Sequence, residues 1–258
     1  MMWWHLNLRS GQPMPAVWRS LRLWLRPALG FLVLLGPLPA AWAQQVLVQA
    51  NVADDTMKTR FGPNRAYFAH AYLGYGLVAG PADAGAALRY GPASAELQAG
   101  GRFKARLNNT VALNLDLGYA YQHYRLAQND RKTVPTPTLH RRESLALHHV
   151  YSEFSLRLNA GRRGNAVGRY LDLLAHGSLV TGSSRTIEDE PNPGIRSVET
   201  PEYGLPYVRR WTGGGGVRLG LDRYAFVGRY RLTSIFGPNY ASWPELPRWV
   251  LGIELGIF

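Results

Sequence analysis

The amino-acid sequence predicts an all-β protein, an eight-stranded antiparallel up-and-down transmembrane β-barrel preceded by a cleavable signal peptide. Three observations predict this fold. Apolar residues recur at every second position in eight separate segments, which is typical of strands with one apolar and one polar face. The connections between these segments are alternately long and short, and the N-terminal segment has the pattern of an export signal.

The N-terminal segment is interpreted as targeting information. Three arginines precede an apolar run over residues 28–38, and the tripeptide Ala-Trp-Ala at residues 41–43 has the small-x-small pattern of a cleavage site. The apolar run is too short to cross a membrane as a helix. We therefore predict a signal peptide over residues 1–43.

The predicted mature chain has two parts. Residues 44–64 are polar and end in Gly-Pro-Asn, so a short periplasmic N-terminal segment is expected there. Residues 65–258 contain the alternating segments and form the predicted barrel. The long stretch before the apolar run leaves two candidate start codons, Met1 and Met14.

The first three predicted strands are residues 65–78, 93–103 and 108–124. The third shows the alternation most clearly, because leucines and tyrosines occupy the odd positions from Val111 to Tyr121 while polar or small residues occupy the even ones. Its apolar face runs for about ten residues, the length of a tilted strand that crosses a bilayer.

The fourth and fifth predicted strands are residues 143–158 and 169–180. In the fourth, His148, Val150 and Phe154 share one face with small and apolar residues. In the fifth, leucines alternate with polar residues. Both segments therefore have the period of a strand.

The last three predicted strands are residues 207–221, 224–236 and 248–258. Only two residues separate the first two of these, which predicts a hairpin. In the last, apolar residues occupy the odd positions from Trp249 to Ile257.

Four connections are long: residues 79–92, 125–142, 181–206 and 237–247. Prolines in the two longest oppose regular pairing, so no strand is expected within them. The other connections are short. This asymmetry is typical of outer-membrane barrels, which have brief periplasmic turns and longer external loops.

Charged residues of both signs lie on the polar faces of the predicted strands. If the apolar faces look outward, these charges enter an interior that is about wide enough for its own side chains. We expect a structural network of balanced charge there rather than a pore, although a narrow channel stays as an alternative. Its expected members are Glu96, Arg102, Asp116, Glu153, Arg157, Asp172, Arg218, Arg229, Arg231 and Glu254.

Aromatic residues gather at both ends of the predicted strands, as in the aromatic belts of membrane proteins. The expected belt at the loop ends consists of Tyr119, Tyr121, Tyr207, Trp211 and Trp249. The expected belt at the turn ends consists of Phe103, Tyr224, Phe226 and Phe258.

The composition excludes several classes of function. The chain has no cysteine, so it has no disulfide, thiolate metal site or cysteine nucleophile. The net charge is +12, but no basic run with interleaved stacking aromatics occurs, so no nucleic-acid partner is expected. We expect the basic residues to contact the anionic head groups of outer-membrane lipid.

No catalytic, cofactor or metal site is predicted. His148 and Ser152 resemble the membrane-facing His and Ser of lipid A deacylase barrels, but at about 3.3 Å per residue they lie roughly 13 Å apart. A lipid-directed hydrolase is therefore only an alternative. His140, His148 and His149 lack a metal-ligand spacing, and the four glycines at residues 213–216 lack the features of a phosphate loop.

The two longest predicted loops have opposite charge. Residues 125–142 are rich in arginine, and residues 181–206 contain most of the loop acids. The two loops either dock together through these charges or are both solvated. Either way, they are the expected sites for a surface ligand.

A resemblance to a known family starts from residues 152–158, Ser-Glu-Phe-Ser-Leu-Arg-Leu, a Gly/Arg turn, and residues 170–173, Tyr-Leu-Asp-Leu. This pattern resembles the middle of Bacteroidota outer-membrane β-barrel proteins of the PorT-like kind, the outer membrane protein beta-barrel domain family. The resemblance covers residues 65–258. It implies a cell outer-membrane location and a structural or surface-interaction role.

The terminal Phe258 is similar to the aromatic end that the outer-membrane insertion machinery binds during biogenesis. However, Phe258 shares its phase with Gly256 and Glu254, whereas the apolar residues occupy the other phase. Either a bulge shifts the last residue, or the signal departs from the usual pattern.

Overall fold

The computed structural model describes residues 59–161, 164–190 and 197–258. The predicted signal peptide, residues 1–43, and most of the predicted segment at residues 44–64 lie outside these ranges. Nine strands occur in the described part: β1 (Tyr67–Ala79), β2 (Ala95–Arg106), β3 (Val111–Leu126), β4 (Arg142–Ala160), β5 (Arg169–Asp189), β6 (Val198–Tyr203), β7 (Trp211–Leu221), β8 (Tyr224–Arg231) and β9 (Trp249–Ile257). The helices there are two short 3-10 turns, Gly91–Ala93 and Pro238–Tyr240.

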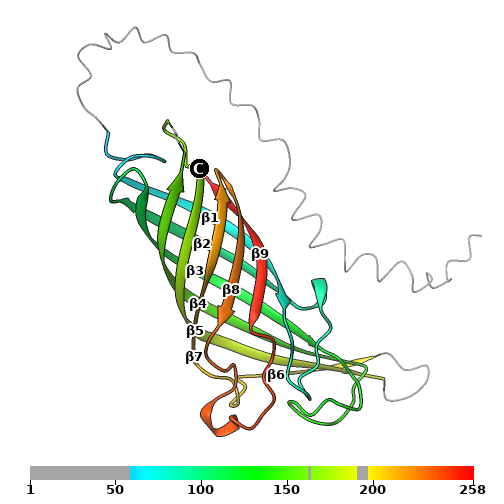
Figure 1. The fold of residues 1–258 in the computed structure, drawn as a ribbon. Helices are drawn as coiled ribbons and strands as arrows, with labels where there is room; N and C mark the ends of the chain where they lie inside the picture. The colour runs from blue at the N-terminus through cyan, green and yellow to red at the C-terminus, as the bar shows by residue number, and fades with distance from the viewer. Residues whose placement is uncertain (1–58, 162–163, 191–196) are drawn as a thin grey trace, which may run out of the picture. The chain divides into compact units, whose positions relative to one another are not determined.

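Eight of these strands close into a ring. The sheet order is β4-β3-β2-β1-β9-β8-β7-β5-β6, and β5 also pairs with β4. All pairings between neighbouring strands are antiparallel. The prediction of an all-β fold with an eight-stranded antiparallel closed sheet is therefore confirmed (Figure 1).

The two ends of the ring differ in the length of their connections. The connections between β2 and β3, between β4 and β5 and between β7 and β8 are short, and they are at the end where the C-terminus lies (Figure 1). The opposite end carries the long connections after β1, β3 and β8 and those around β6. These two ends are called the turn end and the loop end below.

The expectation that no strand lies within residues 181–206 is wrong. β5 continues to Asp189 and pairs with β6, beyond the part of β5 that pairs with β7. Pro201 lies in β6 opposite Thr186. Proline is tolerated there because β6 is an exposed edge strand whose outer side lacks a strand partner in the described ranges.

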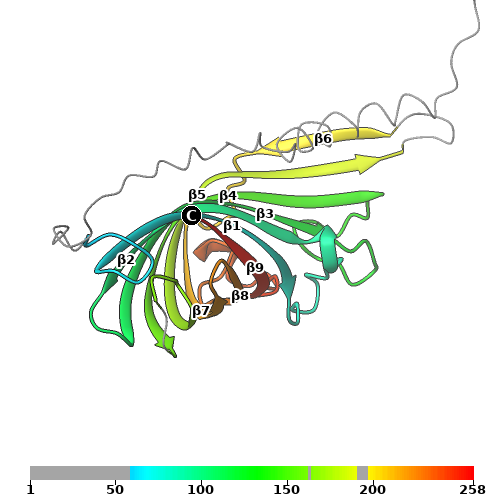
Figure 2. The ribbon, with the colours of Figure 1, turned by 90° about the horizontal axis from the view of Figure 1, so that it is seen from above.

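A sheet extension therefore continues past the ring at the loop end. It consists of residues 121–126 of β3, residues 142–148 of β4, residues 182–189 of β5, and β6. Figure 2 shows β5 and β6 running outward together from the ring. Other boundaries differ less. The strand predicted over residues 207–221 begins at Trp211, and the strand predicted over residues 224–236 ends at Arg231.

The distribution of side chains in the ring is the reverse of that in a water-soluble protein, because charged side chains are buried and large apolar side chains are exposed. Among the largest fully buried side chains are Arg157, Arg218 and Lys104. Leucine, isoleucine, tyrosine and phenylalanine side chains are exposed on the outer face instead. The main apolar cluster, which includes Tyr124, Leu147 and Phe236, lies toward the loop end rather than in the middle of the ring.

Large interior aromatic rings depend on facing glycines. A Cβ atom on Gly220 would lie 1.9 Å from a ring carbon of Tyr170, and one on Gly118 would lie 2.6 Å from the hydroxyl of Tyr151. The Tyr170 ring in turn carries the guanidinium of Arg157 at 3.6 Å from its centroid. Glycine at position 220 therefore fixes the place of an interior arginine.

No helix in the described ranges is long and apolar enough to cross a membrane.

Replacing Gly220 with alanine is expected to destabilise the fold by about 1–3 kcal/mol, since the added methyl group overlaps the Tyr170 ring. Urea titration followed by tryptophan fluorescence measures this change. The matched control is Gly101→Ala, where an added Cβ meets no atom within 4 Å. Equal stability of the two variants would contradict the packing role of Gly220.

Candidate functional site

The inward-facing charges are placed by strand register. Arg102 on β2 lies opposite Asp116 on β3, which lies opposite Glu153 on β4. Asp172 on β5 lies between Arg157 on β4 and Arg218 on β7. Side chains directly opposite on neighbouring strands are about 5 Å apart at Cβ, so most of these neighbours can form ion pairs.

Arg218 is the hub of the interior. Its guanidinium is fully buried and lies 3.0 Å from Asp172, 2.8 Å from Glu254 and 3.5 Å from Asp116. It also donates a hydrogen bond to Glu153. One cation therefore contacts four carboxylates from four strands.

Three further arginines complete this arrangement. Arg102 donates to both oxygens of Asp116 at 2.7–3.0 Å and to Glu254 at 2.9 Å. Arg229 donates to Glu153 at 3.0 Å and to Glu254 at 2.7 Å.

Arg157 pairs with Asp172 at 2.7 Å. We call this set of four arginines and four carboxylates the central network: Arg102, Arg157, Arg218, Arg229, Asp116, Glu153, Asp172 and Glu254.

The central network has no net charge, which is a condition for its burial. An ionised side chain without a partner is very costly to remove from water, and a paired one is tolerated when hydrogen bonds satisfy its remaining atoms. The network occupies the middle of the ring with contacts from β2, β3, β4, β5, β7, β8 and β9. Its side chains fill the interior and cross-link opposite walls.

Two expected members lie outside the central network. Arg231 donates to Glu245 at 2.7 Å and to the carbonyl groups of Leu246 and Pro247, so it fastens the connection between β8 and β9 to the mouth of the ring. Glu96 accepts a hydrogen bond from Gln98. Glu96 and Arg231 lie outside the central network because they are near the loop ends of β2 and β8, whereas the network is in the middle of the ring.

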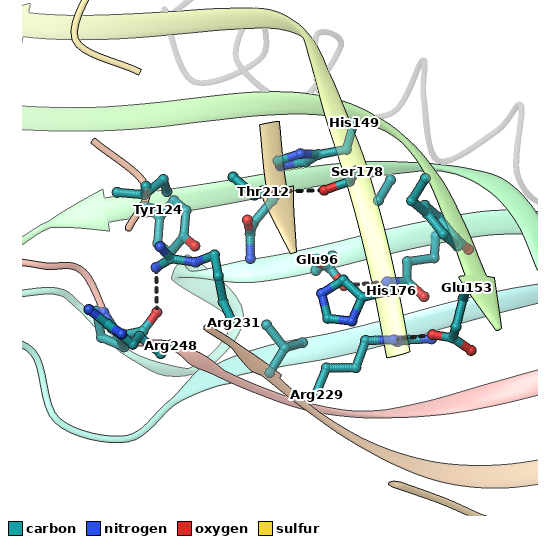
Figure 3. Close-up of a pocket in the computed structure, with 17 residues that line it drawn as sticks. Glu96, Tyr124, His149, Glu153, His176, Ser178, Thr212, Arg229, Arg231 and Arg248 are labelled. Carbon is teal, nitrogen blue, oxygen red and sulfur yellow. Dashed lines mark hydrogen bonds and ion pairs between the residues drawn. The ribbon is translucent and has the colours of Figure 1, made fainter. Parts of the chain in front are cut away.

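A small polar cavity lies between the central network and the loop end (Figure 3). Its volume is about 60 Å³, and its lining includes Glu96, His149, His176, Arg229 and Arg231. The volume suits a few water molecules and is far below the several hundred Å³ of a drug-sized ligand site.

Several buried polar atoms at this cavity have no hydrogen-bond partner among the described residues: Oε1 of Gln98, both ring nitrogens of His149 and Nδ1 of His176. Such atoms bind water when the site is large enough. The cavity can therefore hold a short chain of water but has little room for an organic substrate.

Tyr207 does not belong to the outer aromatic belt. Its side chain is buried and packs on Trp243 at 5.3 Å and on Phe236 at 6.3 Å between ring centroids. Burial raises the pKa of the Tyr207 phenol above its ordinary value. The cause of the difference is that Tyr207 precedes β7, which begins at Trp211, and is buried in the apolar cluster toward the loop end with Leu205, Ile235 and Phe236.

Phe258 also differs from expectation. Its ring packs edge-on against Phe68 at 5.3 Å and His70 at 5.2 Å, which share the inward phase of β1 with the buried Tyr72. No bulge shifts it, because β9 keeps its register with β1 to Ile257. Phe258 is therefore partly exposed at the turn end, with its ring packed against inward-facing residues of β1.

The remaining belt residues lie on the outer face. Trp211, Trp249 and Tyr119 are exposed near the loop end, where Tyr121 is half-buried against His148. At the turn end the exposed aromatic residues are Phe103, Tyr224 and Phe226.

Ion pairs join the two longest predicted loops, residues 125–142 and 181–206, so the alternative in which opposite charges dock them together agrees with the structure. Glu143 is fully buried and pairs with Lys132 and with Arg185, the latter at 2.6 Å. On the surface, Arg142 lies 3.3 Å from Glu188 and His140 lies 2.8 Å from Asp189.

Sequence reasoning missed the buried cluster around Glu143, although Glu143 has the same inward phase as Glu153. Its partner Arg185 is on the part of β5 that was expected to be a loop.

The alternative hydrolase site receives no support from geometry. His148 Nδ1 contacts the hydroxyl of Tyr119 on the outer face, and no hydrogen bond in the described ranges joins His148 to Ser152. Within those ranges there is also no group of three or more His, Asp or Glu side chains that could hold a metal ion.

Comparison of the chain with protein-family models finds no match, and comparison with curated proteins finds none either. The resemblance to PorT-like barrels thus stays a prediction.

Replacing Arg218 with methionine is expected to lower the free energy of unfolding by about 3–5 kcal/mol, because four buried carboxylates then share three arginines. Urea titration of the folded protein measures the loss. Arg210→Met is the control, since Arg210 is exposed. If both variants unfold at the same urea concentration, the network does not hold the ring together.

Proposed function

We propose that this protein is a small outer-membrane β-barrel with a closed interior, acting as a structural or surface-interaction protein through its loop end. The observation that carries the proposal is the reversed distribution of side chains around a closed ring. An apolar outer face with a charged interior is the arrangement that a bilayer requires of a barrel.

The apolar outer face is continuous around the ring. A water-soluble monomer rarely exposes an apolar patch above a few hundred Å², whereas here every ring strand contributes an exposed large hydrophobic side chain. Examples in chain order are Leu73, Leu97, Leu117, Phe154, Leu173, Leu219, Phe226 and Ile253.

The height of this face suits a bilayer. β9 has nine residues, with apolar side chains exposed from Trp249 to Ile257. Transmembrane barrel strands have about 9–11 tilted residues and an apolar band about 25 Å tall. Exposed aromatic residues at both ends agree with belts at the two water boundaries.

Export and insertion complete the proposal. The predicted signal peptide at residues 1–43 would deliver the chain across the inner membrane, with outer-membrane lipid and the insertion machinery as partners. The turn end would face the periplasm, and the loop end would face outside. A surface ligand would then meet the docked loops, residues 125–142 and 181–206.

The filled interior argues against the narrow-channel alternative. The central network spans the ring, and the cavity above it measures only about 60 Å³. The hydrolase alternative is weakened because His148 pairs with Tyr119 rather than with Ser152.

The proposed location predicts that the protein is recovered in the outer-membrane fraction. After extraction in detergent it should show β-rich circular dichroism, and its gel migration should change on heating because a folded barrel resists denaturation by cold detergent. The protein in a planar bilayer should show no discrete conductance.

A water-soluble product with unchanged migration would contradict membrane insertion. Discrete conductance steps that persist after purification would instead contradict the closed interior. The two results are independent, so each part of the proposal can fail separately.

A further inference from the structure

A hollow on the outer face of the sheet extension has features of a ligand site. Its volume is about 240 Å³, and we call it the outer hollow. Its floor consists of residues that strand register brings together. Ser144 on β4 lies opposite Thr186 on β5, and Ser184 precedes Thr186 by two residues on the same face of β5. The floor therefore offers three hydroxyl groups.

Arginines lie at the rim of the outer hollow. Arg125 on β3 is opposite Ser144, and Arg142 on β4 is opposite Glu188. Arg89 is next to them, with its backbone N–H donating to the carbonyl of Arg125 at 2.8 Å.

These positive charges are incompletely neutralised. Arg142 lies 3.3 Å from Glu188 and is half-exposed. The guanidinium groups of Arg89 and Arg125 have no ion-pair partner among the described residues. Partial burial, Arg142 and Arg89 lower the pKa of Arg125, and Glu188 opposes this shift. The lining also includes the carboxylates of Glu188 and Glu199, so an anion would contact the hollow at Arg125, which has no direct ion pair within the described ranges, and at Arg142.

The chemistry of the lining specifies the anion further. Arginine binds phosphate through two parallel hydrogen bonds. The hydroxyl floor, the carboxylates of Glu188 and Glu199 and the rings of Tyr121 and His123 provide donors, acceptors and flat faces that suit a sugar. A phosphate attached to a sugar uses both sets of groups.

The outer hollow lies where such a group would be presented by a membrane. Tyr119 and Tyr121 are on the same face of β3, and Arg125 follows Tyr121 by four residues, or roughly 13 Å. Tyrosines mark the level of the lipid head groups, so Arg125 and Arg142 lie just beyond it. The two tyrosines and the two arginines all lie on the outer face, which would face the surrounding lipid.

We propose that the outer hollow binds the phosphorylated sugar head group of a glycolipid in the outer leaflet. This inference rests on the proposed membrane location. Arg125 and Arg142 contact the phosphate, and the hydroxyl floor contacts the sugar. A bound glycolipid would fix the sheet extension against the membrane surface.

The test uses protein extracted from membranes and shown to be folded by its gel migration. The probe is an acylated glucosamine disaccharide with two phosphates, in neutral detergent micelles. The double variant R125Q/R142Q should bind it roughly tenfold more weakly, because two charge-assisted contacts are lost. The control R131Q changes an exposed loop arginine outside the hollow and should keep wild-type affinity.

Two further arms identify the source of the phosphate. The same acylated disaccharide without phosphates should bind wild-type protein as weakly as the phosphorylated probe binds the double variant. Soluble glucosamine 1-phosphate should not displace the probe at equal concentration.

Unchanged affinity of R125Q/R142Q, or an equal loss in R131Q, would overturn the proposal. Displacement by the soluble sugar phosphate would overturn the lipid as the source. Failure of the wild-type protein to insert in membranes is measured beforehand and would instead refute the proposed function.

Discussion

The structure depends on the pairing of charges inside a closed ring. Arg218 contacts carboxylates from β3, β4, β5 and β9, and it is fully buried. Arg218 and its four carboxylate partners are almost fully buried, so each of these charges requires the others to be in place. This mutual requirement fixes the strands around the interior and explains how a barrel with polar contents can have one arrangement.

The same constraint limits what the protein can do. Side chains that cross-link the walls leave a cavity of about 60 Å³, and the aromatic residues around Tyr207 pack above it at the loop end. A route for ions or a pocket for an organic substrate would need part of the central network to separate. Both proposed functions are therefore placed at the loop end and on the outer face, where the docked loops and the outer hollow lie.

Alternation of residue type predicted the strands and the content of the interior, and the alternately long and short connections predicted that the strands close into a ring. Arg102, Asp116 and Arg218 could be assigned inward because a strand repeats every two residues, whatever its neighbours are. The sequence did not predict that β5 continues to Asp189, since the charged and polar residues there have no apolar face. Their pairing with β6 depends on contacts distant in the chain, such as that between Arg185 and Glu143. Tyr207 was misplaced for a similar reason, because the loop that buries it leaves no periodic signal.

The central claim is that the apolar outer face contacts lipid, and spin labels on β3 test it most directly. The chain has no native cysteine, so single cysteines at Leu115 and Leu117 can be labelled without background. In vesicles, labels there should collide more often with oxygen, which dissolves in lipid, than with a water-soluble nickel chelate. A label at the exposed Arg131 should show the opposite preference. If the nickel chelate reaches Leu115 and Leu117 as often as it reaches Arg131, the outer face is in water and the claim is wrong.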